Sequence, residues 1–124
     1  MTKARQSLGV WGEEQAVDYL RKQGTEILER NYRTPVGEID IIARSRKELL
    51  FVEVKTRRGT GFGLPQEAVN ARKQQQIIRA AQWYLAQRKN FQLQPRFDVI
   101  AILCQSDERV SVQHLPNAFG LGGC

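Results

Sequence analysis

Two short stretches, GEIDII at residues 37–42 and LFVEVK at residues 50–55, decide the fold of this chain. Both are aliphatic runs typical of buried strands, and the polar segment at residues 45–48 predicts a turn between them. Each run nevertheless contains charge near its middle, which is costly in an aliphatic strand unless the charge has a partner or a function. The pattern predicts two adjacent strands that carry a charged site.

The charged residues within these strands include Asp40, Glu53 and Lys55. Because side chains alternate between the two faces of a strand, Glu53 and Lys55 share one face, and the neighbouring valines point to the other, into a core. Two carboxylates and an ammonium then converge on one sheet face, which suits a divalent metal site with a lysine beside it. A buried ion pair, or a charged face exposed to solvent, is the alternative interpretation.

The length, net charge and cysteine count of the chain limit the class of protein to which it can belong. Its 124 residues suffice for one domain with a hydrophobic core, which we expect over residues 1–119, followed by a flexible tail at residues 120–124. The net charge of +6 favours a polyanionic partner, most simply nucleic acid, although charge that only aids solubility is an open alternative. Neither a disulfide framework nor a zinc cluster is indicated by the two cysteines. With no signal-peptide core and no membrane-spanning run, a cytoplasmic location is expected.

Apolar periodicity predicts the remaining elements. The expected elements are helices at residues 8–23 and 65–89 and strands at residues 25–33, 97–103 and 109–115, besides the two strands already described. Asn70 is a candidate break point in the second helical region. The strand at residues 97–103 should be central and the last strand an outer one. The order helix, three strands, helix, two strands predicts an α/β domain in which helices flank a mixed sheet.

A carboxylate on the first helix extends the candidate site. At 100° per residue, Glu13 falls in the middle of the apolar stripe of that helix, and Glu14 falls at its edge. A carboxylate centred on an apolar face needs a partner or a function. A salt bridge to a nearby Arg or Lys is one interpretation, and together with Asp40 and Glu53 a third acidic metal ligand is a comparable one.

Other charged and aromatic residues have weaker assignments. A set of basic residues could track a phosphate backbone or form a solvated basic surface: Arg44, Arg46, Lys47, Arg57, Arg58 and Arg72. Arg57 and Arg58 are the best placed of these, because they follow the second motif strand and open a glycine-rich loop, residues 57–65, that we expect to be mobile and to close over substrate. The other assignments are a structural ion pair for Arg96 and Asp98, no catalytic role for His114, and core positions for Trp11, Trp83 and Tyr84.

Several motifs, taken in order, resemble a known family. They are GxxGExxA at residues 9–16, GEID at residues 37–40, FVEVKTR at residues 51–57, Lys73, and RFDV at residues 96–99. Over nearly the whole chain they look like the small bacterial YraN family of predicted nucleases. Asp40 with Glu53-Val54-Lys55 also resembles the PD-(D/E)xK motif of restriction-endonuclease-like nucleases, with Ile39 at the position of the proline.

The resemblance implies a fold and an activity. The family is similar in fold to archaeal Holliday junction resolvases, which implies a restriction-endonuclease-like sheet and a metal-dependent endonuclease acting on DNA, with branched or structured DNA as a candidate substrate. It implies that Glu13, Asp40 and Glu53 hold Mg²⁺ or Mn²⁺, and that Lys55 is the catalytic lysine. Lys73 matches a recurrent family lysine that could reach the site or a phosphate. A homodimer is expected by analogy, and a nucleic-acid-binding module that keeps the fold without cleaving is the alternative function.

Overall fold

A computed structural model of the chain describes residues 2–59, 69–88, 92–105, 107 and 109–120, with side chains from residue 8 onward. Several predicted features lie outside these residues. They are most of the glycine-rich loop, the start of the second helical region near residue 65, its end near residue 89, and all but the first residue of the tail.

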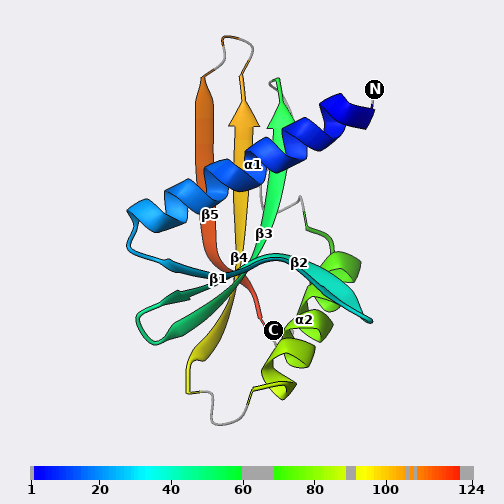
Figure 1. The fold of residues 1–124 in the computed structure, drawn as a ribbon, viewed down its shortest axis with the longest axis vertical. Helices are drawn as coiled ribbons and strands as arrows, with labels where there is room; N and C mark the ends of the chain where they lie inside the picture. Colours follow the sequence, from blue (N-terminus) through cyan, green and yellow to red (C-terminus); the bar gives the residue numbers. More distant parts are fainter. Residues whose placement is uncertain (1, 60–68, 89–91, 106, 108, 121–124) are drawn as a thin grey trace.

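The elements follow one another in the expected order α-β-β-β-α-β-β (Figure 1). They are α1 (Thr2–Lys22), β1 (Glu26–Thr34), β2 (Gly37–Ser45), β3 (Glu48–Arg58), α2 (Ala71–Ala86), β4 (Gln94–Cys104) and β5 (Val110–Phe119). The mixed α/β class predicted from the sequence is confirmed. No described helix is both long and apolar enough to cross a membrane.

The five strands form one mixed sheet in the order β1-β2-β3-β4-β5. The first three make an antiparallel meander, and β4 returns parallel to β3 after α2. β5 then adds antiparallel to β4 at the edge. The expectations of an inner fourth strand and an outer fifth strand are therefore confirmed.

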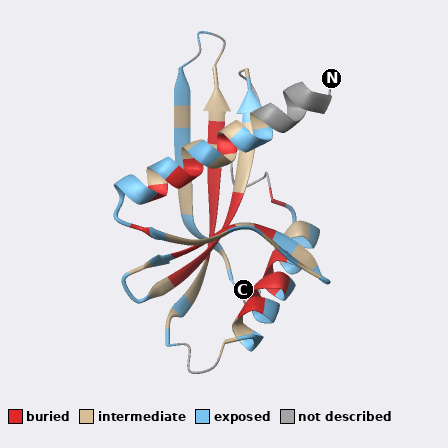
Figure 2. Ribbon diagram, viewed as in Figure 1, coloured by how far each residue is buried: buried red, intermediate tan, exposed pale blue. Residues whose placement is uncertain are grey.

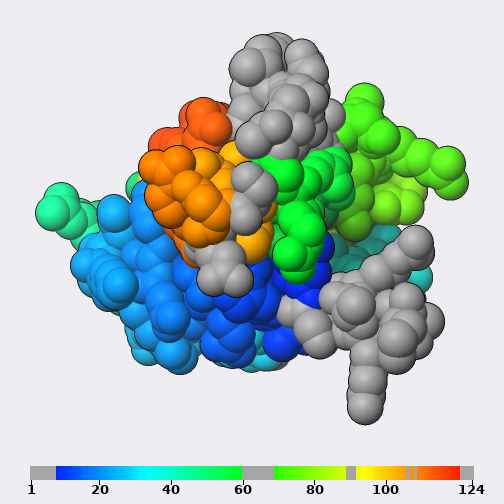
Figure 3. Space-filling view, turned by 90° about the horizontal axis from the view of Figure 1, so that it is seen from above, coloured from blue at the N-terminus to red at the C-terminus, as the bar shows by residue number. Residues whose placement is uncertain are grey.

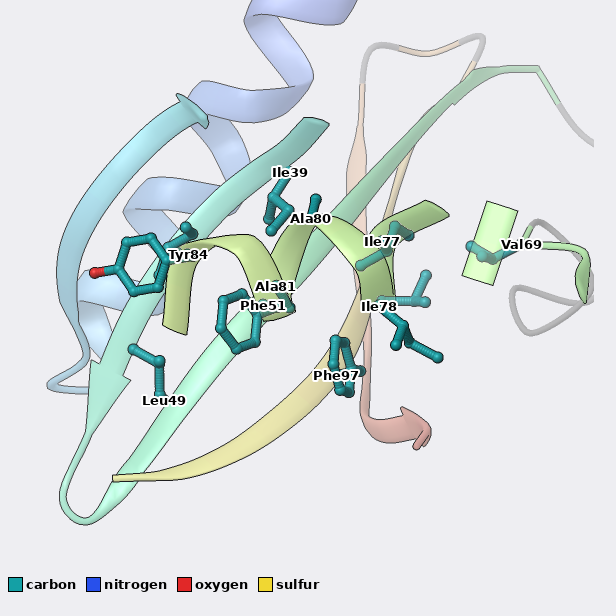
Figure 4. Close-up of a cluster of buried hydrophobic side chains, with 12 residues drawn as sticks. Ile39, Leu49, Phe51, Val69, Ile77, Ile78, Ala80, Ala81, Tyr84 and Phe97 are labelled. Atoms are coloured by element: carbon teal, nitrogen blue, oxygen red, sulfur yellow. The ribbon is translucent and has the colours of Figure 1, made fainter. Parts of the chain in front are cut away.

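The two helices cover opposite faces of the sheet. In β3, Leu49 and Phe51 pack with α2, whereas the alternate residues Leu50 and Val52 pack with α1. The α2 side of the core is an aromatic and aliphatic cluster (Figure 4), and the inner strands are the most buried part of the fold (Figure 2). Burial on both faces explains why the β3 sequence is an almost continuous apolar run.

Asn70 begins the second helix. Its side-chain carbonyl accepts a hydrogen bond from the Lys73 N–H at 2.9 Å, which makes it the N-cap of α2. The break expected near Asn70 is therefore the start of the described helix. This cap fixes the position of Lys73 in the first turn.

A close approach between α1 and β3 depends on Gly12. A Cβ atom at this position would clash with the side chain of Thr56 on β3, whereas a Cβ atom at Gly9 would meet nothing within 4 Å. Both glycines lie inside the same helix. Gly12 therefore allows α1 to lie against the carboxyl half of β3, and Glu13 follows it directly.

The two helical glycines should respond oppositely to alanine. Gly9→Ala should raise the free energy of unfolding by about 0.5–1 kcal/mol, because alanine is the better helix former and the space is open. Gly12→Ala should lower it by about 1–3 kcal/mol, because overpacking forces the helix and strand apart. Urea denaturation of the wild type and both variants measures the difference, and equal shifts for the two variants would contradict the contact.

Candidate active site

The site lies where β2 and β3 diverge. These strands pair from Ser45 and Glu48 up to Ile41 and Val52, where the pairing ends. Beyond that point β2 continues beside β1 alone, and β3 continues beside β4 to its last residue. Asp40 and Glu53 are the next residue of each strand past the last pair, so the fork brings two carboxylates together.

Asp40 takes part in the backbone hydrogen bonding of the fork. Its Oδ2 accepts a hydrogen bond from the Val54 N–H at 2.8 Å. The side chain thus serves as acceptor for a β3 backbone donor that lies beyond the last β2–β3 pair. A buried backbone N–H without an acceptor is costly, so this bond stabilises the fork and fixes the carboxylate.

Glu53 is the most enclosed ionisable group of the site, with only 6% of its side chain exposed. Burial and the nearby charge of Asp40 raise the pKa of Glu53 to about 7, against the opposing effect of Lys73 and Lys55. Burial also raises the pKa of Asp40, although hydrogen bonds from the Val54 N–H and from Glu53 oppose it. Both carboxyl groups therefore bind a proton more readily than they would in water, and an added positive charge would stabilise their ionised forms.

Two lysines from different elements approach the same oxygen. The Nζ atoms of Lys55, on β3, and Lys73, on α2, each lie 3.8 Å from Glu53 Oε2. Seen from above, the carboxyl end of β3 lies between α1 and α2, which is why both helices contribute to the site (Figure 3). The convergence predicted for Asp40, Glu53 and Lys55 is present, and Lys73 joins it.

Glu13 faces the same pocket from α1. Burial and the charge of Asp40 raise the pKa of Glu13, and a hydrogen bond with the Asn31 side chain and the charge of Arg30 oppose that rise. Its neighbour Glu14 instead forms an exposed salt bridge with Arg30 at 2.8 Å. The salt-bridge interpretation thus describes Glu14, and Glu13 belongs to the pocket.

Asn31 is a site neighbour that sequence reasoning missed. It lies in β1 with a φ of 52°, between residues that pair with Ile39 and Ile41 of β2. Asparagine is depleted in strands and tolerates the left-handed conformation better than most residues. An asparagine inside an otherwise ordinary strand was the available signal.

An open pocket of about 350 Å³ joins these groups. The residues that give it its charge are Glu13, Glu38, Asp40, Glu53, Lys55, Arg57 and Lys73. Carboxylate oxygens are the ligands that Mg²⁺ and Mn²⁺ prefer, and the buried Glu53 and half-buried Asp40, whose pKa values are raised, favour an added cation. Among the described residues no three acidic, His or Cys side chains are already gathered closely enough to hold a metal. The fit of the pocket to a divalent cation therefore rests on Asp40 and Glu53. Glu13 would contribute after a small movement or through water.

The basic residues lie in separate parts of the fold. Arg46 and Lys47 are in the turn between β2 and β3, and Arg57 and Arg58 are at the end of β3, about 30 Å away along the strand. One surface expectation needs correction. Trp83 is not a core residue, because 41% of it is exposed on α2. Trp11 packs against the α1 cluster and Tyr84 is buried, as expected.

A second buried carboxylate has a different environment. Asp98 is 0% exposed, and its oxygens accept hydrogen bonds from Arg96 at 2.8 and 2.9 Å, from His114 Nε2 at 2.7 Å and from the Asn117 N–H at 3.0 Å. Burial alone would raise the pKa of Asp98, but these bonds outweigh it and lower the pKa. The structural ion pair predicted for Arg96 and Asp98 is confirmed. His114 also bonds Tyr19 through Nδ1, at 3.1 Å.

Comparison with known proteins identifies relatives along nearly the whole chain. The model of a family described as "Uncharacterised protein family UPF0102" matches residues 12–102. A UPF0102 protein of Syntrophotalea carbinolica is 62% identical over 99% of this chain and 99% of its own length. Another, from Trichlorobacter lovleyi, is 48% identical over 96% of this chain and 94% of its own length. A third, from Syntrophomonas wolfei, is 47% identical over 90% of this chain and 96% of its own length.

The raised pKa of Glu53 predicts a pH-dependent stability in metal-free buffer. The pKa of Glu53 is about 7 in the folded protein and ordinarily 4.5, so between these values the folded state binds more protons. The contribution of Glu53 to the free energy of unfolding is then fully present below pH 4.5. It is lost as pH rises to 7, by up to about 3 kcal/mol. Urea denaturation in EDTA at pH 4.5, 5.5, 6.5 and 7.5 measures this loss.

Glu53→Gln is the matched control for that experiment, because it removes the titrating group and keeps the shape of the side chain. Its stability should depend less steeply on pH in the same window. The slope that remains comes from Asp40 and Glu13, whose pKa values are raised in the same direction. A wild type whose stability is flat or rises between pH 4.5 and 7 would contradict the assignment.

Proposed function

This chain belongs to the uncharacterised protein family UPF0102, the YraN-type family that its motifs indicate, and we propose that it is a metal-dependent endonuclease. The proposed substrate is DNA, with branched or structured DNA as the first candidate, and the proposed cofactor is Mg²⁺ or Mn²⁺. The proposal includes membership of the restriction-endonuclease-like PD-(D/E)xK superfamily.

One observation carries the proposal. At the fork, the carboxylates of Asp40 and Glu53 meet within a pocket that also contains two lysines. Paired carboxylates supply hard oxygen ligands for a divalent cation, and a lysine beside them can stabilise charge that develops on a phosphate. Metal-dependent phosphodiester hydrolysis can use both kinds of group when they lie within a few ångströms of one another.

Each residue has a proposed role. Asp40 and Glu53 would hold the cation, with Glu13 contributing directly or through water. A bound divalent cation lowers the pKa of a coordinated water and offsets negative charge on the phosphate. Lys55, next to Glu53, would orient the attacking water and stabilise the pentacovalent phosphorus. Arg57 and Arg58 follow Lys55 along β3 and would contact the DNA backbone.

A non-catalytic nucleic-acid-binding module is the second candidate function, and the net charge of +6 favours it. It shares the fold and the affinity for DNA with the first. It differs in having no turnover with any divalent cation. The two candidates are therefore separated by cleavage and not by binding.

We expect the purified protein to cut labelled DNA with Mg²⁺ or Mn²⁺ and to be inactive in EDTA. Linear, flapped and four-way-junction DNA, with single-stranded RNA alongside, identify the substrate. Asp40→Asn keeps an acceptor for the Val54 N–H and Lys55→Met keeps the length of the side chain, and each should reduce the rate by at least about 100-fold. Asp107→Asn and Lys22→Met make the same chemical changes at exposed positions away from the pocket and should keep wild-type rates.

The outcomes separate the hypotheses. Cutting that survives in Asp40→Asn or Lys55→Met would show that the site assignment is wrong. Salt-sensitive DNA binding without any cutting would favour the binding module. An absence of both would exclude both functions for these substrates.

A further inference from the structure

We propose that Lys73 changes partner when the site is loaded: it neutralises Glu53 in the metal-free protein and binds a substrate phosphate once a divalent cation occupies the carboxylates. This inference rests on the proposed function, because it concerns the same pocket. It adds that cation and phosphate bind cooperatively there, and that Lys73 couples them.

The proposal starts from the surroundings of one carboxylate oxygen, Glu53 Oε2. Glu53 Oε2 has two ammonium groups at 3.8 Å, one from β3 and one from α2. A divalent cation bound to Glu53 repels both ammonium groups, because like charges would then lie within a few ångströms of one another. The lysine that is freer to move turns away from the carboxylate.

The net charge of the pocket indicates which ligand it attracts before and after a divalent cation binds. With its carboxyl groups ionised, the set Glu13, Asp40, Glu53, Lys55 and Lys73 has a net charge of one negative, which attracts a cation. One divalent cation changes the net charge of this set to one positive, which attracts an anion. Of the remaining charged groups lining the pocket, Glu38 pairs with Arg33 at 3.6 Å, and Arg57 adds a positive charge. The loaded pocket is therefore a phosphate site, and the metal-free pocket is not.

Lys73 is better placed than Lys55 to move. Lys55 is two residues from Glu53 on the same strand and the same face, so its backbone holds it beside the carboxylate. Lys73 stands on a separate element at the rim of the pocket, with 33% of its side chain exposed. Rotation about its side-chain bonds redirects the ammonium without moving the helix.

The start of α2 also favours an anion. α2 has 16 residues and no acidic residue in its first turn, so no carboxylate of that turn offsets the positive end of its dipole. The Asn70 cap holds Lys73 in that turn. A phosphate bound by Lys73 therefore lies near this end of the helix, where Glu53 supplies the negative charge in the metal-free protein.

This coupling predicts that loss of the Lys73 charge changes the affinity for the cation and the affinity for DNA in opposite directions. Removing the Lys73 charge should strengthen cation binding, because a competitor for Glu53 is lost. The same change should weaken DNA binding to the loaded protein, because a phosphate contact is lost. A residue that only stabilises the fold would weaken both, and a residue that only binds DNA would leave the cation affinity unchanged.

The test is Lys73→Gln. Calorimetric titration of the DNA-free protein with Mn²⁺ should show about five- to tenfold tighter binding than in the wild type. Fluorescence anisotropy with labelled duplex in Ca²⁺, with gels to verify that the DNA stays intact, should show about five- to tenfold weaker binding. In EDTA the two proteins should bind the duplex within about twofold of each other, because the ammonium is then engaged with Glu53.

Two controls complete the design. Lys22→Gln makes the same charge change at the exposed end of α1 and should leave the Mn²⁺ affinity unchanged. Lys73→Arg keeps the charge and should restore wild-type behaviour in both assays. An unchanged or weaker Mn²⁺ affinity in Lys73→Gln, or undiminished DNA binding in Ca²⁺, would overturn the partner exchange. A wild type that binds no Mn²⁺ would instead refute the proposed function itself.

Discussion

The end of the β2–β3 pairing at Ile41 and Val52 is the constraint on which the rest of the site depends. If the two strands stayed paired, the Asp40 side chain would not be free to accept the Val54 N–H, and no pocket would open between them. Because β2 leaves β3 there, a carboxylate acts as the hydrogen-bond partner of a backbone amide at 2.8 Å. The same carboxylate then lies beside Glu53. The backbone requirement of the fork and the chemistry of the pocket are thus met by one residue.

The two buried carboxylates Asp98 and Glu53 differ in how fully the fold satisfies their charge. Asp98 receives bonds from an arginine, a histidine and a backbone N–H, and its pKa is lowered. Glu53 has two ammonium groups only at 3.8 Å and a second carboxyl group beside it, and its pKa is raised to about 7. The first charge is satisfied within the fold. The second is left short of positive charge, which is a property expected of a site that binds something else.

Much of this could be predicted from the sequence, because local patterns determine it. Alternation within β3 placed Glu53 and Lys55 on one face, and helical periodicity placed Glu13 on the inner side of α1. Residues whose position depends on contacts between elements were harder to predict. Asn31 becomes a neighbour of Glu13 through the packing of α1 against β1, and its unusual residue type within a strand does not indicate which residue it meets.

The error at Trp83 has the same origin. Trp83 was assigned to the core because large aromatic residues are usually buried, but the buried positions of α2 are Ile77, Ile78, Ala80, Ala81 and Tyr84. Trp83 lies outside that stripe. Which face of a helix meets the sheet is decided by packing, and the type of a single residue does not override it.

The two lysines neutralise Glu53 only in part, and this has a cost in stability. An apolar or amide side chain at this position would avoid the cost of burying a carboxyl group beside Asp40, so the native arrangement lowers stability near neutral pH. A single close, bidentate arginine would remove that cost, as Arg96 does for Asp98. The chain instead places two ammonium groups at 3.8 Å, which reduce the repulsion without ending it. A carboxylate pair held this way is stable enough to fold and still deficient in positive charge, and that deficiency is what a divalent cation would remove.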